Sequence, residues 1–151
     1  MTSLTLVRRI AARPSIVFEA LATADGLAAW WGPDDLPVIH AEMDARVGGA
    51  FRVRFRTFDG QEHEACGDVI EVRPPERLVM SWRFTAGGEI EEVGGNSRIE
   101  FDLRPIDGGV ELTFTHANLR NEASALSHRR GWTGALDKLV RRLGEAPADA
   151  H

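Results

Sequence analysis

The sequence predicts an α+β fold in which a curved antiparallel sheet of about seven strands wraps a long C-terminal helix. Between Leu36 and about His116, apolar and polar residues alternate with a period of two, which is typical of strands that bury one face. The links between these runs are short and rich in glycine, proline and aspartate, which favours hairpins and antiparallel pairing. Near the end of the chain the apolar period becomes helical, and only this helix is long enough to cover the apolar face of the sheet.

The chain before the sheet predicts one strand and two short helices. Residues 4–10 (LTLVRRI) form the first strand, and Pro14 stands where a first helical turn tolerates its missing N–H. Thr23 can cap a second helix, which Gly32-Pro33 ends. We interpret the Trp30-Trp31 pair as a hydrophobic anchor for this helix, with a flap at a cavity mouth as the alternative. On a helix only one of two adjacent residues faces fully inward.

Four runs in the middle of the chain show the strand alternation. In the first run, Phe51, Val53 and Phe55 alternate with three arginines. We expect Arg52, Arg54 and Arg56 to form a solvated face whose charges meet carboxylates on neighbouring strands. The other runs cover residues 80–84, 99–104 and 110–116. The segment from Glu62 to Val72 has mixed parity, so the sequence leaves its facing open; a bulge near Gly67 would reconcile the pattern.

The C-terminal helix is predicted over residues 127–143. One apolar stripe runs along it: Trp132, Leu136, Leu139 and Leu143. His128, four residues before Trp132, falls on the same stripe. Arginines in the last turn complement the negative end of the helix dipole. We therefore expect Trp132 and Leu136 to contact the sheet near Phe101 or Phe114.

Length and composition exclude several classes of protein. The chain has 151 residues, of which 43% are apolar and 27% charged, which suits one domain at residues 1–144 and a flexible C-terminal tail at 145–151. The net charge of −5 lacks the basic surplus that nucleic-acid binding requires. The N-terminus does not resemble a signal peptide, and no apolar run approaches the roughly 18 residues of a membrane span. With a single cysteine, Cys66, we expect a soluble cytoplasmic protein.

Four stretches of the sequence resemble the family related to the C-terminal domain of the heat-shock-protein-90 ATPase activator. They are RRIAARPSIVFEALATADGLAAWWGP at positions 8–33, DARVGGAF at 44–51, GDVIEVRPPERLVMSW at 67–82, and FTHANL with SHRRGW at 114–119 and 127–132. The resemblance implies the SRPBCC superfamily of START-type, birch-pollen-allergen-like and polyketide cyclase domains. It also implies a helix-grip fold with a mostly apolar cavity between sheet and helix. Members bind lipids, hormones and polyketides, and some catalyse cyclisation or dehydration, so the fold does not define a reaction.

Strand parity, the helical stripe and the implied cavity together predict a set of ligand-binding residues. They are Trp30, Phe51, Phe55, Trp82, Phe101, Phe114, His116, His128, Trp132 and Leu136. For the aromatic members an ordinary packed core is the alternative. His116 and His128 are the candidates to hydrogen-bond a polar end of a ligand or to act in acid–base catalysis, with a purely structural role as the alternative. If both line the cavity, they should lie within about ten ångströms of each other.

Three hypotheses about function follow from these residues and the resemblance. The first is a non-enzymatic or weakly enzymatic carrier or sensor that binds a hydrophobic small molecule in the cavity. The second is a cyclase- or dehydratase-type enzyme in which His116 and His128, with Glu64 or Asp68, move protons on a polyketide-like or carbonyl substrate. The third is a chaperone-interaction module, although the extra N-terminal domain of the eukaryotic activator has no counterpart here.

Cofactors and metals are not expected. Two histidines from different elements do not make a metal-ligand set, and the sequence contains no phosphate loop, dinucleotide fingerprint or nucleophile elbow. The expected partner is a small hydrophobic molecule rather than a nucleic acid, and a homodimer remains open.

Overall fold

The computed structural model describes residues 2–32, 36–86 and 97–144. Its elements, in chain order, are β1 (Thr2–Ile10), α1 (Pro14–Ala22), α2 (Ala24–Trp30), β2 (His40–Met43), β3 (Ala50–Arg56), β4 (Glu62–Arg73), β5 (Arg77–Ala86), β6 (Ser97–Ile106), β7 (Gly109–Leu119) and α3 (Glu122–Leu143). The strands form one antiparallel sheet in the order β1-β7-β6-β5-β4-β3-β2. The predicted α+β helix-grip architecture is confirmed. The predicted tail at 145–151 lies outside the described residues.

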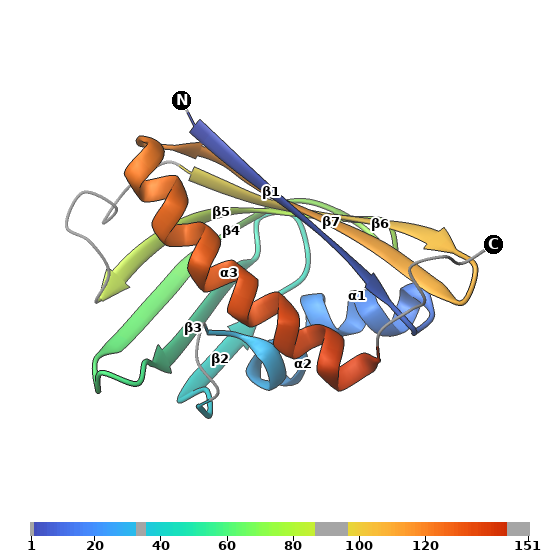
Figure 1. Cartoon of the computed structure of the whole chain (residues 1–151), viewed down its shortest axis with the longest axis horizontal. Coiled ribbons are helices and arrows are strands. Elements are labelled where there is room, and N and C mark those ends of the chain that lie inside the picture. The colour runs from blue at the N-terminus through green and yellow to red at the C-terminus, as the bar shows by residue number, and fades with distance from the viewer. Residues whose placement is uncertain (1, 33–35, 87–96, 145–151) are drawn as a thin grey trace.

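Helix α3 lies across one face of the sheet, and α1 and α2 lie near its C-terminal half (Figure 1). The apolar stripe of α3 faces the sheet, because Trp132, Leu136 and Leu139 are all at most 5% exposed. The ring centroid of Trp132 lies 4.4 Å from that of Phe114 on β7, which confirms the predicted contact. Sheet and helix therefore share one core.

The two short helices pack as a unit that supports the end of α3. The side chain of Thr23 accepts a hydrogen bond from the Gly26 N–H at 3.0 Å and so caps α2, as predicted. The indole Nε1 of Trp30 donates to the carbonyl oxygen of Ala20 at 2.8 Å, which fastens α2 to α1. This bond supports the interpretation of Trp30 as an anchor.

Helix α3 begins at Glu122, five residues before the predicted start at Ser127. Asn121 is the N-cap, and its side chain accepts a hydrogen bond from the Ser124 N–H at 2.9 Å. The first turns contain Ser124 and Ala125, which are small and buried, so the apolar stripe is weak there. For this reason the sequence pattern alone placed the start too late.

Strand β4 contains two irregularities, and neither lies at Gly67. The register with β5 shifts between Glu64 and Ala65 and again between Val69 and Glu71. The second shift leaves Ile70 without a Cα partner in the β5 register, and this side chain is 49% exposed. The two irregularities flank Gly67 closely on either side, so the prediction that a bulge near Gly67 reconciles the mixed parity is confirmed.

The sheet face opposite α3 is a polar face with charges in pairs. Arg52 and Arg54 donate to the two carboxylate oxygens of Glu64, at 3.2 Å and 3.4 Å. Arg56 donates to Glu62 on the same neighbouring strand at 2.8 Å. The expectation that these arginines meet carboxylates across the strands is confirmed.

Candidate functional site

An aromatic cluster lies between α3 and the sheet. It consists of seven rings: Trp31, Phe51, Trp82, Phe114, His116, His128 and Trp132. None of these residues is more than 8% exposed. The Trp82 ring has contacts on several sides, with centroids 5.1 Å from Trp132, 5.4 Å from His116 and 5.8 Å from Trp31. Most pairs are tilted or edge-on, the arrangements that the charge distribution of aromatic rings favours.

A chain of hydrogen bonds, the histidine relay, runs through this cluster. The indole Nε1–H of Trp132 on α3 donates to Nδ1 of His116 on β7 at 3.0 Å. Because Nδ1 accepts, the ring proton of a neutral His116 lies on Nε2, which then donates to Ser97 Oγ on β6 at 2.9 Å. Ser97 Oγ donates in turn to the carbonyl oxygen of Trp82 on β5 at 3.3 Å. The relay thus connects the helix with three strands.

His128 is held in place by its own helix. Its Nδ1 lies 2.9 Å from the carbonyl oxygen of Ser124, one turn earlier in α3. A carbonyl oxygen can only accept, so Nδ1 carries the proton and Nε2 has the lone pair in the neutral ring. The His128 ring stands edge-on to the His116 ring, with 4.8 Å between the centroids. The prediction that both histidines lie inside, within about ten ångströms, is confirmed.

The surroundings keep His116 uncharged. Its side chain is fully buried, and this burial lowers the pKa of His116 well below its ordinary value, with the nearby His128 as a smaller second cause. Both ring nitrogens already have hydrogen-bond partners within the protein. A neutral imidazole with two occupied nitrogens is suited to positioning its neighbours rather than to donating a proton.

The remaining predicted ligand-binding residues lie around or away from the cluster. The Phe101 ring is 5.1 Å from Phe114, and Trp30 is 6.3 Å from Phe101, so both extend the cluster toward α2. Leu136 is fully buried one helical turn after Trp132. Phe55 stacks on His63 instead, with 5.3 Å between the ring centroids, at the other end of β3 from Phe51.

Two members of the site were missed by the sequence prediction. Trp31 was expected to compete with Trp30 for the inward face of a helix, yet it is only 2% exposed. It is the C-cap of α2 with extended backbone angles, so its side chain is free of the helical spacing. Ser97 shares its parity with Ile99 and Phe101, and this pattern could have placed it inside.

The carboxylates considered for catalysis lie on the wrong face. Glu64 is paired with Arg52 and Arg54 on the polar face of the sheet. Asp68 is exposed, at a position of β4 where its N–H bonds to Ser81 Oγ. Neither residue belongs to the aromatic cluster, so the suggestion that they assist the histidines is wrong.

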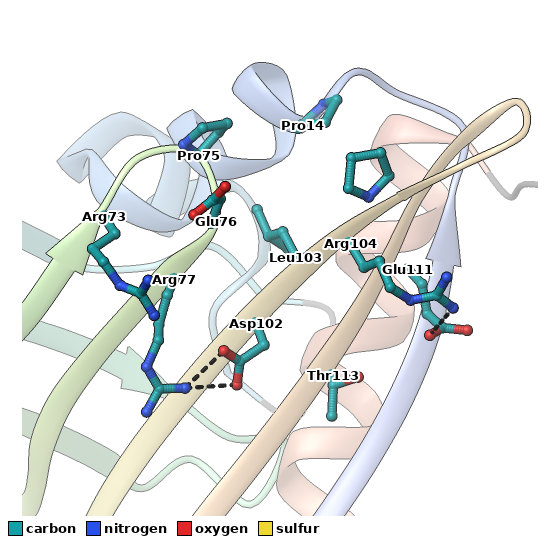
Figure 2. Close-up of a pocket in the computed structure, with 11 residues that line it drawn as sticks. Pro14, Arg73, Pro75, Glu76, Arg77, Asp102, Leu103, Arg104, Glu111 and Thr113 are labelled. Carbon is teal, nitrogen blue, oxygen red and sulfur yellow. Dashed lines mark hydrogen bonds and ion pairs between the residues drawn. The ribbon is translucent and has the colours of Figure 1, made fainter.

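A separate groove of about 540 Å³ lies on the polar side of the sheet, near the start of α1 (Figure 2). Three prolines, one leucine and several ion-paired side chains line it, and none of the predicted ligand-binding residues does. Arg77 Nη1 lies 2.7 Å and 2.8 Å from the two oxygens of Asp102, and this pairing raises the pKa of the arginine. Arg104 donates to Glu111 at 2.7 Å. These cations already have partners, so the groove is not an evident anion site.

Comparison with known proteins decides the family. Residues 11–144 match the model of the family described as activator of Hsp90 ATPase homolog 1-like protein. The chain belongs to this family. Proteins of the family belong to the SRPBCC superfamily, in agreement with the resemblance seen in the sequence. No curated protein sequence matches the chain significantly.

Solved structures share the fold over nearly the whole chain. A crystal structure from Chromobacterium violaceum is 26% identical with a TM-score of 0.81, covering 97% of this chain and all (100%) of that one. A crystal structure of the AHSA1 protein from Silicibacter pomeroyi is 27% identical with a TM-score of 0.80, covering 94% and 97%. An AHSA1-like protein from Aeromonas hydrophila, 19% identical with a TM-score of 0.75 and coverages of 93% and 90%, shares the fold.

Two further observations concern possible partners of this family member. Among the helices of the described residues, none is long and apolar enough to span a membrane. Within residues 2–32, 36–86 and 97–144, no three His, Cys, Asp or Glu side chains gather as a group that could hold a metal ion. The helix-grip fold of the family commonly binds hydrophobic ligands.

Proposed function

We propose that this protein binds a hydrophobic small molecule between the sheet and α3, as a carrier or sensor. The observation that supports the proposal most is the placement of two histidines and a serine inside an otherwise aromatic interior. The ligand would lie against the rings of the aromatic cluster, and the imidazole of His128 would meet its polar end.

An ordinary core has no need of these polar groups. Removing an imidazole or a hydroxyl from water costs free energy unless hydrogen bonds replace the lost hydration, and here they do so only through a specific relay. Ligand sites in proteins combine apolar and aromatic walls with a few well-placed polar groups, which is the composition of this cluster. His116 is the poorer ligand contact of the two, because both of its nitrogens already bond to Trp132 and Ser97.

Binding requires the cluster to rearrange. The rings of Trp82, Trp132 and Trp31 lie between 5.1 and 5.8 Å apart, centroid to centroid, so a ligand at this position must part rings that are now in contact. The free energy of lost ring contacts has to be recovered from ligand contacts, which favours a flat or elongated apolar molecule that replaces one ring surface with another.

An enzymatic role receives less support. Burial keeps His116 neutral, and the two carboxylates considered as its helpers lie on the polar face. Nothing among the described residues singles out a chaperone-binding surface. A carrier or sensor needs neither an acid–base pair nor a chaperone-binding surface.

The test is a binding titration with a pair of ligands that differ in one polar group. Decanol and decane are added separately to the wild-type protein, and tryptophan fluorescence reports occupancy of the cluster. We expect both to bind, and His128→Leu, which conserves apolar volume, to weaken decanol binding by about tenfold while leaving decane binding unchanged. His40→Leu, on the exposed edge strand β2, is the control and should change neither.

Two results would refute the proposal. The first is that the wild-type protein binds neither molecule. The interior is then a close-packed core without a ligand site, and the domain acts through its surface. Binding that is identical in the wild type and in His128→Leu, for both molecules, removes the histidine from the site. Native mass spectrometry of protein purified from its own host would add the identity of any bound compound.

A further inference from the structure

We propose that Trp132, His116 and Ser97 form a latch that holds the N-terminal half of α3 on the sheet only while His116 is neutral, so that mild acid releases this half of the helix. The latch concerns the protein alone and does not rest on ligand binding. If the interior does hold a ligand, the same event would open the site.

The latch follows from the chemistry of the relay. Trp132 Nε1–H can bond to His116 only while Nδ1 has a lone pair. A proton added to Nδ1 turns His116 into a donor at both nitrogens, so that two N–H groups face each other across 3.0 Å. The bond between helix and sheet is then lost, and the indole N–H is left buried without an acceptor. Protonation of His116 at Nδ1 therefore excludes the hydrogen bond that joins α3 to the sheet.

None of the described residues that the structure places against His116 is acidic, so none of them can balance a positive charge on its ring. Leu4 of β1 and Ile99 of β6 are its Cα partners on either side. Trp82 of β5 packs against its ring, and Ser97 of β6 accepts from Nε2. From α3 it meets Trp132 and His128. Of these described neighbours only His128 is ionisable, and its proximity lowers the pKa of His116 further instead of stabilising a positive charge there.

Within the part of the chain that the structure describes, three further hydrogen bonds tie α3 and the residue after it to the rest of the protein, and all three lie at its C-terminal half. Asp137 accepts from Arg8 of β1 at 3.1 Å, and Lys138 Nζ donates to the carbonyl oxygen of Trp31 at 2.9 Å. Just beyond the helix, the carbonyl oxygen of Gly144 accepts from Ala11 N–H at 2.8 Å. None of these three bonds involves a histidine. Acid should therefore loosen the half before Trp132 while the other half stays attached.

Amide hydrogen exchange, measured by NMR on the wild-type protein without ligand, tests this directly. Protection factors, corrected for the intrinsic pH dependence of exchange, are compared at several pH values between about 7 and 5. Because the open form binds a proton at an ordinary histidine pKa, protection of residues 125–132 should fall about tenfold for each pH unit below about 6.5. Protection of β6 and β7 should stay unchanged over the same range.

Variants separate the latch from a general effect of acid. His116→Asn places a non-titrating carbonyl acceptor near the position of Nδ1, so protection of residues 125–132 should no longer depend on pH. His40→Asn, at an exposed histidine of β2, should behave as the wild type does. If His116→Asn does not fold, the Trp132 indole N–H resonance in the wild type provides the readout, because its exchange should accelerate with that of the helix amides.

Three results would overturn the proposal. The first is a loss of protection that spreads equally over sheet and helix. The second is the same pH dependence in His116→Asn as in the wild type. The third is a helix whose protection, and a Trp132 indole whose exchange, do not change between pH 7 and 5 (about the range in which an ordinary histidine titrates).

Discussion

Gly67 of β4 is a residue whose missing side chain sets the distance between two strands. A Cβ atom at this position would lie 1.9 Å from the carbonyl oxygen of Ser81 on β5 and 2.8 Å from the ring of Phe51. The nearest obstacle is backbone, which cannot move without separating the strands. Phe51 and Trp82, which flank this point, both belong to the aromatic cluster, so the glycine also determines how closely those rings pack.

Gly67→Ala should therefore destabilise the protein strongly. We expect a loss of about 3 kcal/mol in the free energy of unfolding, because overpacking a closed interior forces the backbone to shift. Urea unfolding followed by circular dichroism measures it. Gly60→Ala is the control: its φ of +86° is unfavourable for alanine, but nothing lies within 4 Å, so its cost should be about 1 kcal/mol. Equal losses in the two variants would contradict the steric explanation.

Individual residues of the site were predictable where strand parity is strict. His116 and Trp82 follow alternating apolar runs, and both are buried as expected. Trp31 was not predictable in this way, because it stands at the point where helical spacing ends and extended backbone begins. The hydrogen bonds of Ser97 depend on a histidine of the neighbouring strand and a tryptophan of the helix, and no local pattern contains that information.

At the scale of elements, α3 depends on a cap that the sequence pattern did not reveal. Asn121 has extended backbone angles, and it closes the first turn through its side chain and through its carbonyl oxygen, which accepts from Ala125 N–H at 3.0 Å. Because α3 provides one wall of the core, weakening its first turn weakens the whole domain.

Asn121→Ala should lower the free energy of unfolding by about 1 kcal/mol, since it removes the acceptor for an otherwise unsatisfied N–H. Asn121→Asp is the matched comparison: it retains the acceptor and adds a negative charge at the positive end of the helix, so its stability should equal or exceed that of the wild type. Thermal unfolding of the three proteins measures the difference. An alanine variant as stable as the aspartate variant would show that the cap contributes nothing.

The elements that were predicted correctly are those with a strong period and a clear end signal. Thr23 and the glycine after Trp31 bound α2, and the arginine alternation defines β3. Strand β4 lacks such a signal, since its bulges are set by the register against β5, a tertiary property. The early start of α3 escaped detection because small and polar residues fill its first turns, where contact with the sheet, rather than residue size, determines burial.

On the scale of the whole molecule, the two faces of the sheet are different environments. One face packs an aromatic interior against α3, and the other has ion pairs such as Arg77 with Asp102 and Arg104 with Glu111. Hydrogen bonds from Arg77 and Arg104 are the largest cause of lowered pKa values for the half-buried carboxyls of Glu71 and Glu111 respectively. These carboxyls bind protons only at low pH, whereas the effect of His116 on stability begins at mildly acidic pH.

This separation predicts two phases in the pH dependence of stability. In the folded protein the pKa of His116 is lower than in the unfolded chain. The unfolded chain therefore binds more protons, and the free energy of unfolding decreases as the pH falls. The contribution of His116 is complete above a pH of about 6.5 and is lost at about 1.4 kcal/mol per pH unit below it. Urea unfolding at several pH values between about 7 and 5 measures this slope, and the carboxyl contributions follow only at lower pH.

His116→Asn should flatten that slope, although its stability at neutral pH will be lower. His40→Asn, at an exposed site, should retain the wild-type slope. A slope that survives in His116→Asn would mean that another group binds the proton.

The aromatic composition of the chain makes intrinsic tryptophan fluorescence a direct probe of the cluster. The chain contains four tryptophans and no tyrosine, so near-ultraviolet absorption and emission come almost entirely from indoles. The four rings form a continuous series, because Trp30 lies 5.3 Å from Trp31, which lies 5.3 Å from Trp132 and 5.8 Å from Trp82. Excited states at such separations are shared between rings, and neighbouring imidazoles quench them. Any displacement of α3 should therefore be visible in the colour and polarisation of the emitted light, with no label attached.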